Sequence, residues 1–368
     1  MVDLNTHPDS TAITTPQPPS PRISNGNDRR AQLVYDSETS EPEDENIEYI
    51  DPDENLLDDL PSDITNIDLI QLRIHSIPAL NLDRFESLEY FCLRENLIQD
   101  IEGLEAIGPH LKELDLYDNR ISHIENLGPE QGDGVWKALE NLDLSFNKIK
   151  KIRHVNHLQN LKNLYFVQNK ISKIENLDCL NQLVNLELGG NRIRVLENLD
   201  GFSSLKQLWV GKNKITKLQG LDKLKQLEIL SIQANRITKL EGLQALESLE
   251  ELYISNNGIE KIEGLEQNHK LRVLDLSSNR VCHVENLSGL ISLQEFWASS
   301  NKLESFEELE HELANLANLD TVYFEGNPLE TKNRLTYRNK IRLALGPGIK
   351  QIDATPVTGG IEGINGLQ

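Results

Sequence analysis

An asparagine recurs along most of this chain at a nearly constant spacing. The series runs from Asn96 to Asn327, and seven successive intervals between Asn147 and Asn301 are each 22 residues long. Each asparagine closes the pattern LxxLxLxxN, as in LVNLELGGN at 183–191. A repeat period of about 20 to 50 residues is typical of stacked-repeat proteins. The period therefore disfavours an ordinary globular core, because each unit has to bury its apolar side chains against its neighbours.

The spacing of apolar residues within one unit predicts its local structure. Positions 4 and 6 alternate with polar positions, which is typical of a short strand with two side chains turned into the core. After the asparagine, apolar residues follow at positions 11, 14, 17 and 20, which favours a 3₁₀ or irregular return segment over a full helix. The sequence therefore predicts an α/β leucine-rich-repeat solenoid. Its parallel sheet would be curved and lie on the concave face, with short 3₁₀ or irregular segments on the convex face.

The recurrent asparagine is predicted to be structural. The backbone turns after each strand and leaves N–H and C=O groups that the sheet does not pair. A buried Asn side chain can donate and accept hydrogen bonds, so it can satisfy groups of both kinds. We therefore expect replacement of Asn213 to lower stability without a selective loss of function.

About twelve units are predicted over residues 61–327. The first is degenerate, and we expect Ile67, Ile70 and Leu72 at positions 1, 4 and 6, with His75 in place of the asparagine. Two longer intervals indicate a loop around GPEQGDGVWK, which follows Asn119, and an amphipathic helix within ESFEELEHELANLANL, which follows Asn301.

The two ends of the chain differ in composition from the repeats. Residues 1–60 hold fifteen acidic residues and three arginines and are rich in Pro and Ser, which predicts a disordered tail. Residues 328–357 are predicted to form a C-terminal cap, because an open solenoid end exposes its core. Residues 358–368 are expected to be a loose tail.

One column of side chains, at position 5, points out of the sheet between the two inward positions. Five of its eleven members are Trp or Tyr, although aromatic residues make up 5% of the chain, and four are carboxylates. The column reads Cys92, Asp115, Asp143, Tyr165, Glu187, Trp209, Ser231, Tyr253, Asp275, Trp297 and Tyr323. Because strand geometry keeps these side chains out of the core, we expect the rings to be exposed and to bind a partner protein with basic and apolar surface. The alternative is cross-strand packing that only stiffens the sheet.

Composition and motifs argue against several other functions. The formal net charge of −22 disfavours nucleic acid and anionic membranes as partners. The chain has no GxxxxGK[ST], GxSxG or HExxH motif, so we predict no enzyme activity, no cofactor and no metal site. Cys92, Cys179 and Cys282 form no CxxC pair, which is typical of a protein in a reducing compartment.

The repeats and the end segment also resemble a known family. Strings such as NKISKIENL, NRIRVLENLD and NGIEKIEGLE are similar to the leucine-rich-repeat regulatory subunits of type-1 protein phosphatase (protein phosphatase 1). The segment NPLETKNRLTYRNKIRLALGPGIKQIDATPV is similar to the C-terminal cap of that family, although GPG replaces its usual Leu-Pro. The resemblance covers about residues 60–357.

This resemblance implies a non-catalytic regulatory subunit that binds the catalytic subunit of protein phosphatase 1 through the concave face. It further implies control of that enzyme's activity and maturation, an inactive metal-depleted bound form, a role in mitosis, and a location in nucleus and cytoplasm. A third subunit, a phosphatase inhibitor, is a partner that the resemblance leaves open. The family's contact positions fall on Asp143, Tyr165, Glu187, Trp209, Asp275, Glu295, Trp297 and Tyr323, and the position-5 column adds Tyr253. The alternative function is a structural scaffold for a cytoskeletal or ribonucleoprotein assembly.

Overall fold

The computed structural model describes residues 56–127 and 135–357. These ranges belong to one compact unit of the chain, Ile50–Gln368. The predicted acidic tail up to residue 55, most of the predicted loop around GPEQGDGVWK and the predicted loose tail from residue 358 lie outside the described residues.

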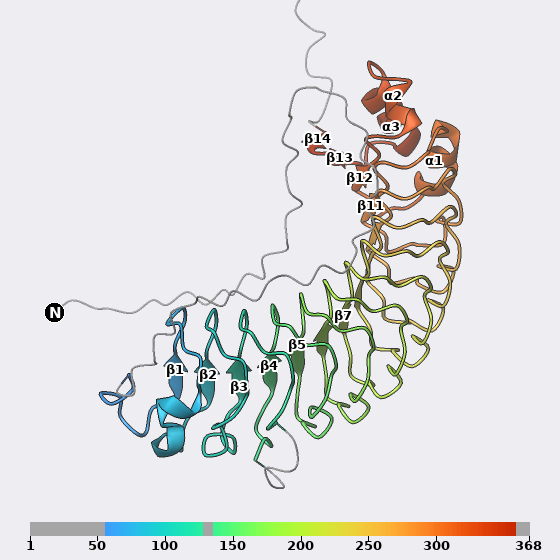
Figure 1. Cartoon of the computed structure of the whole chain (residues 1–368). Helices are drawn as coiled ribbons and strands as arrows, with labels where there is room; N and C mark the ends of the chain where they lie inside the picture. Colours follow the sequence, from blue (N-terminus) through green and yellow to red (C-terminus); the bar gives the residue numbers. More distant parts are fainter. Residues whose placement is uncertain (1–55, 128–134, 358–368) are drawn as a thin grey trace, which may run out of the picture. The chain divides into compact units, whose positions relative to one another are not determined.

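Twelve strands of three residues each follow one another through the sheet, and each pairs in parallel with the next (Figure 1). The middle residue of every strand is buried, and Figure 1 shows the strands along the inner side of the arc of repeats. The strands are β1 (Asn66–Asp68), β2 (Tyr90–Cys92), β3 (Glu113–Asp115), β4 (Asn141–Asp143), β5 (Asn163–Tyr165), β6 (Asn185–Glu187), β7 (Gln207–Trp209), β8 (Ile229–Ser231), β9 (Glu251–Tyr253), β10 (Val273–Asp275), β11 (Glu295–Trp297) and β12 (Thr321–Tyr323). The predicted leucine-rich-repeat solenoid is thereby confirmed.

The return segments are short and mostly irregular. Two 3₁₀ helices, η1 (Pro78–Leu80) and η2 (Leu82–Arg84), lie between β1 and β2. In the repeat around Asn191, seven apolar side chains are each at most 1% exposed: Leu183, Leu186, Leu188, Ile193, Leu196, Leu199 and Phe202. Full burial of one aliphatic side chain is worth about 1.5–3 kcal/mol, so stacking of the units supplies the driving force for folding.

The recurrent asparagines link neighbouring repeats, as Asn213 illustrates. Its side-chain Oδ1 accepts a hydrogen bond from the Ile193 N–H at 2.9 Å. Its Nδ2 donates to the carbonyl oxygens of Leu188 and Val210 at 2.9 and 3.1 Å. The same arrangement recurs at Asn191, so the predicted structural role of the asparagines is confirmed.

The first repeat has a register that differs from the predicted one. β1 pairs with β2 so that Ile67 occupies position 4, not position 1. Ile70 and Leu72 are consequently 42% and 48% exposed, and Leu72, not His75, stands where an asparagine is expected. The Leu72 N–H donates to the side chain of Asn96 at 3.1 Å. The prediction was wrong because the apolar residues of this short segment fit two registers, and pairing with β2 selects one.

Two side chains that were assigned to irregular segments belong to the core. Leu57, placed in the predicted tail, is 4% exposed, and Trp136, placed in the predicted loop, is also 4% exposed. Leu57 packs at the N-terminal end of the stack, where the first repeat has no preceding repeat to cover it.

Within the described ranges, the α-helices occur only toward the C-terminus. The helix α1 (Phe306–Leu313) lies in the segment predicted to be helical, and its N-cap residue Ser305 accepts a hydrogen bond from the Glu308 N–H at 3.1 Å. After β12 come α2 (Pro328–Thr331), α3 (Tyr337–Leu345) and the antiparallel pair β13 (Gln351–Ile352) and β14 (Thr355–Pro356). β13 extends the parallel sheet beyond β12.

The last repeat has no following repeat to accept hydrogen bonds from its backbone N–H groups. A side chain of the C-terminal segment accepts them. Asp353 is 9% exposed, and its Oδ1 accepts hydrogen bonds from the N–H groups of Phe324 and Glu325 at 2.8 and 3.0 Å. The Tyr337 hydroxyl donates to the same oxygen at 3.2 Å. Asp353 therefore takes the place of a backbone carbonyl of the next repeat, since the equivalent N–H of an inner repeat, that of Leu188, donates to the Trp209 carbonyl at 2.7 Å.

Candidate protein-binding face

Eight of the nine predicted site residues form a single row across the sheet, which we call the concave row. Each is the last residue of its strand, and parallel pairing sets neighbouring members side by side. The row comprises Asp143 (β4), Tyr165 (β5), Glu187 (β6), Trp209 (β7), Tyr253 (β9), Asp275 (β10), Trp297 (β11) and Tyr323 (β12). The ninth residue, Glu295, begins β11 and lies two residues before Trp297.

The side chains of the row are less exposed than the sequence predicts. The aromatic members are half-buried, and Asp275 is only 6% exposed. Adjacent strands are about 4.8 Å apart, so large side chains at equivalent positions pack against one another. The rings are therefore only partly exposed, where the sequence predicts exposed rings.

The aromatic residues gather at the C-terminal end of the row. The ring centroid of Trp297 lies 6.1 Å from that of Tyr253 and 5.6 Å from that of Tyr323. The Trp297 Nε1–H donates to the Glu295 carboxylate at 3.1 Å, and the Tyr253 hydroxyl donates to Glu251 at 2.8 Å. These contacts hold the rings in place before any partner arrives, which lowers the entropy cost of binding.

Four carboxylates lie on the same face as the rings, and none of them is in an ion pair with another described residue. Burial is the main cause that raises the pKa of Asp143, Glu187, Asp275 and Glu295 above the ordinary carboxyl value. None of the four forms an ion pair with another described residue. A partner that brings Lys or Arg side chains would relieve this unfavourable burial of negative charge.

The N-terminal part of the face holds a cluster that position 5 alone does not reveal. The Arg94 guanidinium lies 3.2 Å from the Asp115 carboxylate and 4.3 Å from the ring centroid of Tyr117. The Tyr117 ring centroid lies 4.8 Å from that of Phe146, which is 41% exposed. Arg94 and Tyr117 occupy position 7 and Phe146 position 8, so comparing those two columns as well would have found the cluster.

The buried charge of Asp275 leads to a testable pH dependence. Because its pKa is higher in the folded protein than in the unfolded chain, the folded state binds more protons between the two values, and stability increases as the pH falls through the raised pKa. We expect Asp275→Asn to stabilise the protein at pH 7 by about 0.5–2 kcal/mol and to reduce the gain in stability on acidification. Urea denaturation at several pH values measures both effects. The exposed Glu260→Gln serves as the control, and an unchanged pH profile in Asp275→Asn would contradict the prediction.

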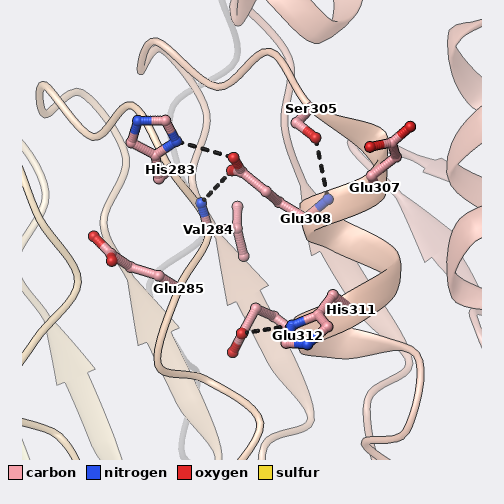
Figure 2. Close-up of a pocket in the computed structure, with 8 residues that line it drawn as sticks. All are labelled: His283, Val284, Glu285, Ser305, Glu307, Glu308, His311 and Glu312. Carbon is pink, nitrogen blue, oxygen red and sulfur yellow. Dashed lines mark hydrogen bonds and ion pairs between the residues drawn. The ribbon is translucent and has the colours of Figure 1, made fainter.

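A surface hollow of about 440 Å³ lies beside α1 and not on the concave row (Figure 2). Its polar groups are engaged in holding α1 against the preceding repeat. The Glu308 carboxylate binds the His283 Nδ1 at 2.9 Å and accepts from the Val284 N–H at 3.0 Å. The Glu312 carboxylate accepts from the N–H of Leu287 at 2.9 Å. We therefore interpret this hollow as structural.

Two further classes of site are absent from residues 56–127 and 135–357. No group of three or more His, Cys, Asp or Glu side chains there could hold a metal ion. In the same ranges, no helix combines the length and the apolar character that a membrane span requires.

Two family models match the chain, and both describe leucine-rich repeats. The model described as "Leucine-rich repeat" matches residues 92–210. The model described as "Leucine Rich repeats (2 copies)" matches residues 203–245 and 247–292.

Curated proteins are similar to parts of the chain. A stretch of 118 residues, 32% of the chain, is 48% identical to "Protein phosphatase 1 regulatory subunit SDS22" of Saccharomyces cerevisiae, of which it covers 33%. A stretch of 96 residues is 54% identical to the protein of the same name in Schizosaccharomyces pombe and covers 26% of each chain. A plant relative, "Protein phosphatase 1 regulatory inhibitor subunit PPP1R7 homolog" of Arabidopsis thaliana, is 34% identical over 39% of the chain and 47% of its own length. The chain thus spans less than half the length of these relatives, and within the matched segments the resemblance to phosphatase regulatory subunits is confirmed.

Solved structures share the fold. An internalin (inlF) of Listeria monocytogenes superposes with a TM-score of 0.62 at 23% identity, over 80% of this chain and 88% of that one. A leucine-rich-repeat protein of Leptospira interrogans superposes with a TM-score of 0.58 at 26% identity, over 74% of each chain.

Proposed function

Because this chain belongs to the leucine-rich-repeat proteins, whose concave sheets present rows of side chains, we propose that it is a non-catalytic regulatory subunit of protein phosphatase 1. In this proposal the concave row and Glu295 bind the phosphatase catalytic subunit. The observation that carries the proposal is the row itself, in which preorganised rings alternate with carboxylates that lack ion-pair partners among the described residues. The names of the matched relatives supply the identity of the partner.

The chemistry of the row suits a folded protein partner. Trp and Tyr are preferred anchors of protein interfaces, since they bury large area at low entropy cost. The row spans nine consecutive strands from β4 to β12, so its length exceeds what a short peptide would cover. Packing that only stiffens the sheet would account for the rings, and backbone N–H groups of Ser145 and Ser277 bond Asp143 and Asp275. Neither accounts for Glu187 and Glu295, which have no ion-pair partner among the described residues.

We further propose that binding controls the activity and maturation of the catalytic subunit by holding an inactive, metal-depleted form. The proposal also includes a role in mitosis, a location in nucleus and cytoplasm, and a third subunit that inhibits the phosphatase. These finer points rest on the family resemblance.

The test is reconstitution of the complex from purified full-length chain and catalytic subunit. We expect a stable complex on size-exclusion chromatography, with less bound metal and lower phosphatase activity than the free catalytic subunit. A complex that is fully metal-loaded and active would contradict the inhibitory proposal while leaving the interaction intact. Absence of any complex would favour the alternative, a scaffold of a cytoskeletal or ribonucleoprotein assembly.

The acidic N-terminal segment provides a separate prediction. Removal of residues 1–55 is expected to leave the dissociation constant for the catalytic subunit unchanged, because the concave row lies wholly within the repeats. The deletion ends at residue 55 since Leu57 is part of the core. Isothermal titration calorimetry with both forms measures the effect, and loss of binding on deletion would place the site in the tail.

A further inference from the structure

The C-terminal cap carries charge opposite to that of the chain as a whole. Residues 328–350 contain six Lys or Arg and one acidic residue, in a chain whose formal net charge is −22. Lys332 and Lys350 are paired with carboxylates at 2.9 Å, and Arg338 donates to backbone carbonyls at the β13–β14 turn. The remaining three cations are Arg334, Lys340 and Arg342. None of them forms an ion pair with another residue in the described ranges.

The same cap exposes two leucines almost completely. Leu335 is 97% exposed and Leu343 is 83% exposed, the highest values among the large apolar side chains of the described residues. The other face of α3 buries Tyr337, Ile341 and Leu345 in the core, so folding of the solenoid does not require a leucine at position 343. Exposed aliphatic side chains beside unpaired cations are typical of an interaction surface.

A shallow groove of about 210 Å³ lies between α1 and α3, which pack side by side (Figure 1). Phe306, Lys340, Leu343 and Ala344 line it, with Glu307 and Glu310 on the α1 side. The Lys340 Nζ lies 5.1 Å from the Phe306 ring centroid and donates to the Asn333 side chain at 2.6 Å. The latter contact ties a side chain of the groove to Asn333, which directly precedes Arg334 and Leu335 in the chain.

We propose that this surface is a docking site for an acidic segment of a partner protein that carries leucine-like side chains between its carboxylates. The cap patch comprises Phe306, Arg334, Leu335, Lys340, Arg342 and Leu343. Its cations would pair with the carboxylates of the segment, while the aliphatic side chains of the segment would contact Phe306 and the two leucines. Apart from Phe306 on α1, the patch lies on the cap, and it shares no residue with the concave row, so this proposal is independent of phosphatase binding.

Charge decides between a peptide and the other polyanions. A membrane surface or a long nucleic acid would also meet the exposed Glu304, Glu307 and Glu310 and the acidic remainder of the chain. A short segment can follow the cations of α3, because Glu307 and Glu310 lie on the α1 side of the groove. Screening limits the effect of more distant acidic residues to about 8–10 Å at physiological ionic strength. Phosphate groups, moreover, would make no use of the two exposed leucines.

The probe is a fluorescent synthetic peptide in which glutamates flank two leucines one helical turn apart. We expect saturable binding to the full chain by fluorescence anisotropy, and weaker binding at high salt. Arg342→Gln and Leu343→Ser should each weaken it at least about fivefold. The matched variants Arg194→Gln and Ile291→Ser, at exposed positions elsewhere in the repeats, should leave it unchanged. Because Leu343 is outside the core, its variant should keep the melting temperature.

Several results would overturn the proposal. One is absence of saturable binding, and another is equal binding of a peptide with glutamine in place of glutamate or serine in place of leucine. Equal binding by the Arg342→Gln and Leu343→Ser variants would place the peptide elsewhere. Binding of phosphatidylserine vesicles or single-stranded RNA through the patch, in place of the peptide, would assign it to a different class of ligand.

Discussion

Replacement of Trp297 by Ala is expected to weaken binding of the protein phosphatase 1 catalytic subunit by about 30-fold or more. Truncation of an anchoring Trp in a well-packed interface typically costs about 2 kcal/mol or more. Trp297 contacts Tyr253 and Tyr323 and is oriented by Glu295, so its loss also leaves those neighbours less well placed. Surface plasmon resonance with the purified catalytic subunit measures the change.

The control for Trp297→Ala is Ile291→Ala, which removes a side chain that is 65% exposed and outside the concave row. It should leave the affinity unchanged. Glu187→Gln tests the electrostatic half of the same interface, and its effect should diminish at high salt. If Trp297→Ala binds as tightly as the parent chain while its circular dichroism spectrum is unchanged, the concave row is not the binding site.

Replacement of Asn213 by Ala is expected to lower the free energy of unfolding by about 1–3 kcal/mol. The substitution leaves the buried Ile193 N–H without its partner, which costs about 1–3 kcal/mol. The carbonyls of Leu188 and Val210 lose one of two donors each, because Asn191 and Asn235 still donate to them. Because each repeat contacts mainly its neighbours, hydrogen exchange should increase most in the adjacent repeats. Chemical denaturation and hydrogen exchange measure the two effects.

Asn339→Ala is the matched control for Asn213→Ala, since Asn339 is exposed on α3. Its unfolding curve should coincide with that of the parent chain. A normal melting temperature in Asn213→Ala together with a loss of phosphatase binding would overturn the structural assignment of the asparagines.

The binding face could be located from the sequence because it depends on a strict alternation. Leu186 and Leu188 face the core, so Glu187 between them faces the opposite way, and the same holds in every repeat. The identity of the concave row follows from that alternation alone. Its exposure does not, because the degree of burial of Asp275 depends on which side chains the adjacent strands place beside it.

The ends of the solenoid were the parts that sequence periodicity described least well. Leu57 closes one end and Asp353 caps the other, and neither belongs to a repeating pattern. Leu72 stands at the position that asparagine occupies in the other repeats, although leucine does not resemble asparagine. At an end a unit has one neighbour in place of two, so local composition no longer identifies the side chains that must be buried.

By itself, then, the sequence determined the repeat, its strands, its asparagine ladder and the face on which rings and carboxylates alternate, because each of these repeats with the same burial pattern in every unit. The tertiary structure alone decided the register of the first repeat, the half-burial of the rings and the exposure of Leu335 and Leu343 beside unpaired cations. Those features depend on which surfaces meet when the units stack, and contacts between residues far apart in the chain do not follow from a local pattern.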